Sequence, residues 1–169
     1  MRISITKGHV DDRIDIDRDD GTKAVTHFPK KGPIPHDYVH LAVECRLGLR
    51  DAFWGKIAGG ADPDAIGLMA KAGGHASASR ATKPDPAIVE MVQAERLVEC
   101  FEADFWMGGG DNRALRDMAA SGWIQSQVPD LSLDDAAIDA IRTDIAAFAL
   151  RWAELKTNDL IDLEWRADA

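Results

Sequence analysis

Two kinds of apolar repeat divide the chain and limit the folds that it can adopt. Through residue 28, apolar and polar side chains alternate, as at Ile3 and Ile5 and again at Ile14 and Ile16. From residue 36 onward, the apolar side chains mostly recur at steps of three and four residues. Alternation is typical of a strand with one buried face, whereas the longer repeat is typical of an amphipathic helix. The sequence therefore predicts an α+β protein whose strands gather near the N-terminus.

The strands are predicted to form an antiparallel β-meander over residues 1–28. Asp20-Gly21 is a hairpin-turn dipeptide between the second and third strands. In the third strand, Val25 and His27 fall on one face. Alternation returns in residues 161–165, and this segment is predicted to be a strand that can join the same sheet.

The remainder of the chain is predicted to be mainly helical and to pack on one side of the sheet. The main helices are expected over residues 36–53, 87–106 and 134–157. Residues 73–86 are small, polar and bounded by prolines, which predicts a mobile loop. A chain of 169 residues fits a single domain, and this assigns residues 1–169 to one α+β unit.

The charge and the apolar pattern exclude several classes of partner. The net charge is −9, from 29 acidic and 20 basic residues. Nucleic acids and anionic membranes attract cationic patches, so neither is an expected partner. No apolar run approaches the roughly 18 residues of a membrane span, and the N-terminus lacks the apolar stretch of a signal peptide. We therefore expect a cytoplasmic protein.

One helix start gathers the residues with the most chemical potential. The spacing of His36, His40 and Glu44 places them in one row, on the side of the helix opposite its apolar stripe. Two imidazoles and a carboxylate can hold a divalent metal ion such as zinc, iron or manganese and leave a position open. His27, on a strand that leads toward this helix, is a further candidate ligand. No catalytic residue and no organic cofactor can be assigned from the sequence.

A short motif within this row resembles one from a known class of enzymes. His36-Asp37-x-x-His40 is similar to the His-Glu-x-x-His motif of zinc proteases, with Asp37 in place of the glutamate. The resemblance covers five residues and departs at the general base, so no catalytic role is carried over. An acid in the first helical turn and a His–Glu pair four residues apart are also ordinary stabilising features. The row can therefore be structural as well as metal-binding.

Two hypotheses for the function follow from these observations. In the first, the chain is a noncatalytic protein that acts through a protein partner or as a homodimer. The similar apolar stripes of the second and third long helices, together with Val43 and Leu47 beside the histidine row, motivate it. In the second, the chain is a metal-dependent enzyme, hydrolase-like, with His36, His40 and Glu44 as ligands.

Overall fold

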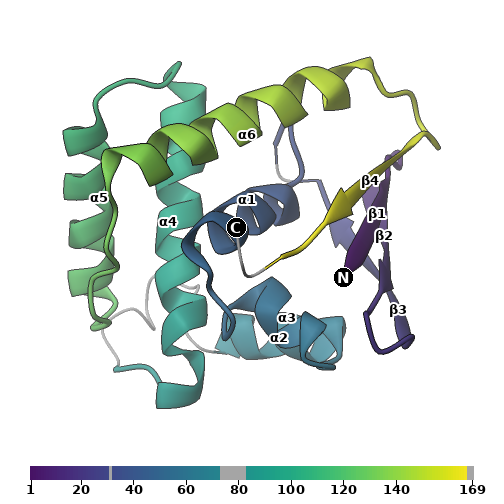
Figure 1. Cartoon of the computed structure of the whole chain (residues 1–169), viewed down its shortest axis with the longest axis horizontal. Helices are drawn as coiled ribbons and strands as arrows, with labels where there is room; N and C mark the ends of the chain where they lie inside the picture. The colour runs from purple at the N-terminus through teal and green to yellow at the C-terminus, as the bar shows by residue number, and fades with distance from the viewer. Residues whose placement is uncertain (31, 73–82, 167–169) are drawn as a thin grey trace.

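The computed structural model describes residues 1–30, 32–72 and 83–166, which form one sheet and a set of helices (Figure 1). The strands are β1 (Arg2–Thr6), β2 (Asp11–Asp17), β3 (Lys23–Pro29) and β4 (Leu160–Glu164). The helices are α1 (His36–Leu47), α2 (Phe53–Ala58), α3 (Pro63–Ala72), α4 (Val89–Trp106), α5 (Asn112–Gln125) and α6 (Asp135–Glu154), with a 3₁₀ turn at Pro86–Ile88 before α4. The predicted α+β class is confirmed.

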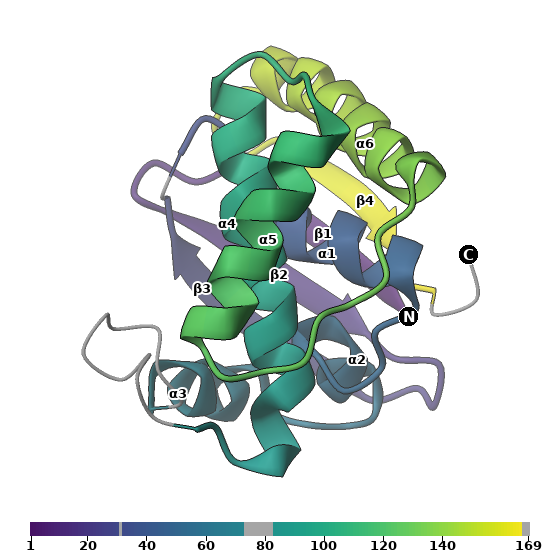
Figure 2. The same cartoon turned by 90° about the vertical axis from the view of Figure 1, so that its left-hand side faces the viewer.

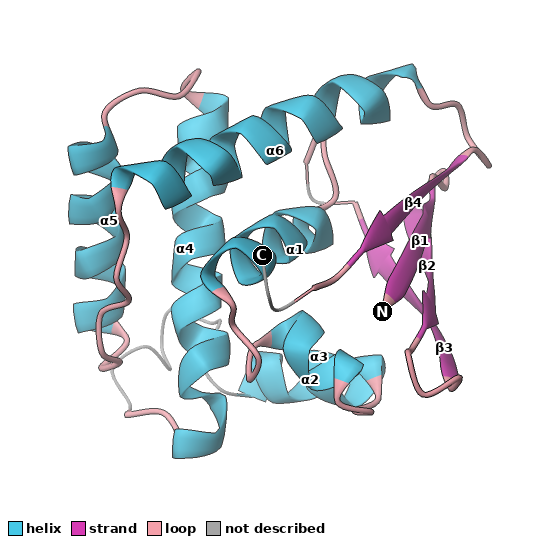
Figure 3. Cartoon of the chain, viewed as in Figure 1, coloured by secondary structure: helices cyan, strands magenta, loops and turns pink. Residues whose placement is uncertain are grey.

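The sheet is fully antiparallel, in the order β3-β2-β1-β4, so the C-terminal strand joins the N-terminal meander as predicted. Ile3 lies opposite Ile16, and Ile5 opposite Ile14. All four side chains are buried on the face that the helices cover (Figure 3). The alternation thus buries an isoleucine face and leaves the charged positions on the other face in water.

The third strand presents Val25 and His27 to solvent. They share a face, as predicted, but it is the outer one, and Val25 is 46% exposed. The register sets this orientation because Ile14 lies opposite Thr26. Residues directly opposite each other point to the same side of a sheet, so Thr26 faces the core and its two neighbours face away.

The first long helix is shorter than predicted. The expected segment 36–53 divides into α1, which ends at Leu47, and α2, which begins at Phe53. Gly48 has a φ of 63° and its N–H caps the carbonyls of Glu44 and Cys45. A glycine in this left-handed conformation is a common helix stop, and it accounts for the break.

Helix α1 lies at the centre of the molecule, between α4 and the sheet and beneath α6 (Figures 1 and 2). Val39 and Val43 are fully buried, and so is Glu44. The face with the histidine row is therefore covered by other helices. The apolar pattern of the sequence predicts, in contrast, that this face lies opposite the core. The apolar face of α1 and its histidine face are therefore both packed inside the protein.

Helix α2 has only six residues and is held at its C-terminal end by a buried arginine. Arg18 Nε donates to the carbonyl of Ile57 at 2.6 Å, and Nη2 donates to the carbonyl of Ala61 at 2.8 Å. Helix ends leave carbonyls without intrahelical partners, and a cation there is favourable. Arg18 thereby connects the sheet to the short helix.

The features that motivated a homodimer are used within the chain. Val43 is buried, and the apolar stripes of α4 and α6 both contribute to the core. Within the described segments, no helix combines the length and apolar character that a bilayer crossing requires. Of the predicted mobile loop, residues 73–82 lie outside the described part of the chain.

The packing around α2 predicts the effect of adding a single methyl group. A Cβ at Gly55 would overlap the backbone of Arg50. Gly55→Ala should lower the free energy of unfolding by about 2 kcal/mol, as overpacking of a core does. Urea unfolding followed by circular dichroism measures this change.

Gly67→Ala, within α3, is the matched control. A Cβ there meets nothing within 4 Å, so the better helix propensity of alanine should raise stability by about 0.5–1 kcal/mol. Equal effects of the two substitutions would contradict the close approach of Arg50 to Gly55.

Candidate metal centre

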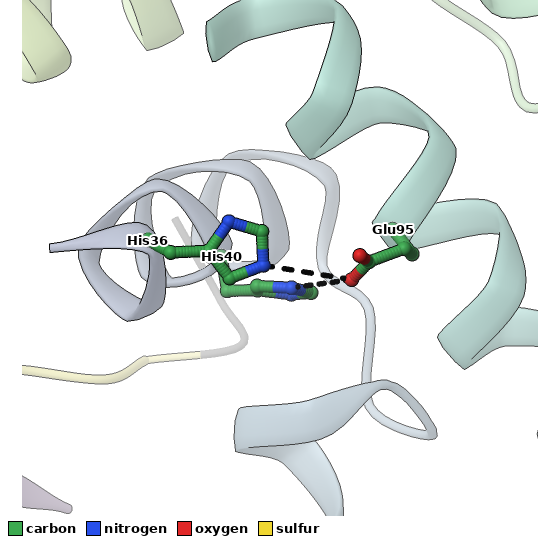
Figure 4. Close-up of side chains that lie close together, drawn as sticks. All are labelled: His36, His40 and Glu95. Carbon is green, nitrogen blue, oxygen red and sulfur yellow. Dashed lines mark hydrogen bonds and ion pairs between the residues drawn. The ribbon is translucent and has the colours of Figure 1, made fainter. Parts of the chain in front are cut away.

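Helices α1 and α4 pack against each other and bring together two histidines and a glutamate. His36 and His40 are one turn apart on α1, and Glu95 faces them from α4 (Figure 4). One donor atom from each of the three lies within 4.8 Å of the other two. Among the described residues, this is the group that could hold a metal ion.

His40 is held from both sides by carboxylates. Its Nδ1 lies 3.2 Å from Oε1 of Glu44, and its Nε2 lies 2.9 Å from Oε2 of Glu95. The second oxygen of Glu44 accepts hydrogen bonds from the backbone N–H groups of Trp54 and Gly55, at 2.7 and 3.3 Å. The carboxylate of Glu44 therefore fixes the orientation of His40 and caps the start of α2.

His36 repeats this arrangement with a different carboxylate. Its Nδ1 lies 2.8 Å from Oε1 of Glu102, about two helical turns beyond Glu95 on α4. Its Nε2 points toward Oε2 of Glu95 at 3.7 Å. The two imidazole rings meet edge to face, with centroids 4.9 Å apart. Each histidine thus uses Nδ1 for its own carboxylate and turns Nε2 toward a shared one.

These distances are close to those of a coordinated ion. Two ligands about 2.1 Å from a tetrahedral ion stand about 3.4 Å apart. The separation of His40 Nε2 from Glu95 Oε2 is 2.9 Å and that of His36 Nε2 from the same oxygen is 3.7 Å. These two separations lie within about 0.5 Å of the tetrahedral value. The third, between the two imidazole nitrogens, is within 4.8 Å, so the rings would move closer together around an ion.

The surrounding carboxylates also favour protonated imidazoles in the absence of a metal. Burial by itself lowers the pKa of His40, but the hydrogen bonds and charges of Glu44 and Glu95 outweigh it and raise the pKa to about 10. For His36, burial also lowers the pKa, and the hydrogen bonds to Glu102 and Glu95 raise it above its usual value. Two cationic histidines among three glutamates are the alternative to a bound ion.

The structure keeps His36, His40 and Glu44 in one row on α1 but places Glu44 outside the group that could hold a metal ion. His36 and His40 come together as predicted, but Glu44 lies on the Nδ1 side of His40, away from the shared carboxylate, and is fully buried. Burial raises the pKa of Glu44, opposed by hydrogen bonds from His40 and from two backbone N–H groups. His27 is exposed on the outer face of β3 and is not part of the group.

Glu95 and Glu102 were not anticipated from the sequence. They are seven residues apart on α4, which places them on one side of a helix. That spacing carries little information in a chain with 29 acidic residues, because many pairs share it. Only the packing of α4 against α1 distinguishes these two glutamates from the others.

No protein-family model, curated protein or solved structure matches this chain, so the candidate site is interpreted from its geometry alone.

The electrostatics of the metal-free site predict a pH dependence of stability. Folded His40 keeps its proton between its ordinary pKa of 6.5 and about 10, a range in which the unfolded chain has lost it. The stabilisation from His40 is therefore complete below about pH 6.5 and is lost as the pH rises toward 10. One such proton changes the free energy of unfolding by at most about 1.4 kcal/mol per pH unit.

Urea unfolding between pH 7 and pH 10, with a chelator present, measures this slope. His40→Gln should make the decline of stability with pH shallower than in the wild type. Equal slopes for the two proteins would show that His40 does not hold a proton in this range.

Proposed function

We propose that the chain binds one divalent transition-metal ion and uses it for hydrolysis. The proposed ligands are Nε2 of His36, Nε2 of His40 and a carboxylate oxygen of Glu95. One observation carries the proposal: both imidazoles turn Nε2 toward a single carboxylate oxygen, while each Nδ1 is bonded to a separate carboxylate. Histidines that ligate metals typically donate their other ring N–H to such a partner.

The two histidines have more carboxylate partners than a structural His–Glu ion pair needs. A structural His–Glu pair four residues apart needs one hydrogen bond. Here Glu44 and Glu102 would fix the tautomer of each ring, and the lone pair on each Nε2 would be left for a common ligand. An ion bound there would replace protons, so its affinity should rise with pH.

The donor set limits the metals. Imidazole nitrogen and carboxylate oxygen suit zinc, and two histidines with one carboxylate also suit iron. Manganese, which accepts carboxylates, stays a third candidate.

Two features support a catalytic ion over a structural one: the number of protein ligands and the exposure of the site to solvent. Structural zinc sites have four protein ligands, whereas catalytic sites have three and a water. The side chains of His36 and Glu95 are each 13% exposed, so the site lies just below the surface. A zinc ion lowers the pKa of a bound water to about 7, which produces a nucleophile for hydrolysis.

Metal binding can be measured directly on protein purified without an affinity tag and stripped with a chelator. Isothermal titration with zinc should give one equivalent for the wild type. Glu95→Gln should abolish this binding, whereas Glu99→Gln, one turn further along α4, should retain it. Glu102→Gln should bind about 10–100-fold more weakly, because it removes the partner of a ligand and not the ligand itself. No zinc binding by the wild type, or equal binding by both position-95 and position-99 variants, would refute the metal site.

The hydrolytic role has its own test, which applies once binding is established. Zinc-loaded protein should hydrolyse p-nitrophenyl acetate faster than the stripped protein and faster than the same concentration of zinc in buffer. The Glu99→Gln variant should match the wild type, and Glu95→Gln should not exceed the buffer control. Stoichiometric zinc without hydrolysis of this or other activated esters would favour a structural ion.

Action through a protein partner or as a homodimer stays a prediction. The apolar residues that first motivated it, Val43 and Leu47, are packed within the chain.

A further inference from the structure

A cavity lies between α6 and the C-terminal part of α4. Figure 1 shows α6 crossing α4 in this region. The cavity encloses about 310 Å³, near the lower end of the usual range for small-molecule sites. Its walls are apolar for the most part. The lining residues are Phe101, Phe105, Ile145, Ala146, Gly108 and Gly109, with Asp104 and Arg142 as the charged pair.

The guanidinium of Arg142 supplies the N–H donors that this cavity leaves for a ligand. Both carboxylate oxygens of Asp104 accept from Arg142, at 2.8 Å each. The N–H groups of Gly108 and Gly109 donate to carbonyls at the end of α4, at 3.2 and 2.8 Å. Arg142 also donates from Nη1 to Asn112, so its bonds to Asp104 and Asn112 use three of the five N–H groups of a guanidinium. The remaining donors belong to Arg142.

The charges at the polar end determine which ligands fit. Asp104 is buried, and Asp139 lies 3.6 Å from Nη1 of Arg142. An anionic ligand would meet these two carboxylates, and a cationic ligand would meet the guanidinium. Because a buried charge needs a compensating partner, an uncharged ligand is favoured.

We propose that this cavity binds an uncharged molecule with an apolar ring and one hydrogen-bond acceptor. The ring would pack against Phe101, Phe105 and Ile145, and the acceptor, such as a carbonyl oxygen, would take a hydrogen bond from Arg142. The site is separate from the histidine cluster and does not depend on a bound metal.

Three probes of similar shape test the chemistry. Indan-1-one has a ring and a carbonyl, indane lacks the carbonyl, and indane-1-carboxylate carries a charge. In ¹H–¹⁵N correlation spectra, indan-1-one should cause saturable shifts of the Gly108 and Gly109 amides. Indane should bind about fivefold more weakly, which corresponds to one hydrogen bond, and the carboxylate more weakly than indan-1-one.

Two neighbouring alanines on α6 give a matched pair of variants. Both are exposed, but Ala146 lines the cavity and Ala147 does not. Ala146→Trp should weaken indan-1-one binding at least about tenfold, and Ala147→Trp should leave it unchanged. Thermal unfolding of both variants confirms that they are folded.

Three outcomes would overturn the proposal. The first is the lack of saturable shifts with indan-1-one in the wild type, and the second is equal binding by the two tryptophan variants. The third is tighter binding of indane-1-carboxylate or indane than of indan-1-one, which would contradict the neutral acceptor.

Discussion

The buried carboxylate of Glu44 connects the candidate metal centre to the surrounding fold. A buried charge is unfavourable unless it is paired with an opposite charge and hydrogen-bonded. Glu44 is fully buried, is paired with His40 and accepts hydrogen bonds from two backbone N–H groups. One oxygen orients His40, and the other accepts the N–H groups of Trp54 and Gly55 at the start of α2. Because α2 has no side-chain cap of its own, the same group that orients an imidazole also anchors this helix.

Helix α2 in turn transmits this constraint to the sheet. Its C-terminal end is held by Arg18, the residue that directly follows β2. The next helix, α3, is joined to β3 by a hydrogen bond from Thr26 to Asp64. The imidazole of His40 is therefore connected to the strands through hydrogen bonds at both ends of α2 and through the backbone of that helix. Such a network limits the motion of the imidazole, and a metal site benefits when its ligands are already in position.

The arrangement of α4 gives one helix two roles. Glu95 and Glu102 face the histidines of α1, whereas Phe101 and Phe105 line the cavity beside α6. A helix turns 100° per residue, so adjacent positions can serve different neighbours. The long, well-packed helix can thus support a polar site and an apolar one within three turns.

The sequence by itself determined the strands, the positions of the long helices and the pairing of His36 with His40, because these depend on local periodicity. Periodicity did not predict that α1 ends at Gly48 or that its histidine face is buried. Periodicity reports which residues share a face of one helix, but not what packs on that face. Only the tertiary structure assigned Glu44 to the Nδ1 side of His40 and brought Glu95, 55 residues away in the chain, to its Nε2. Contacts between distant segments depend on helix packing, which a single helical repeat does not encode.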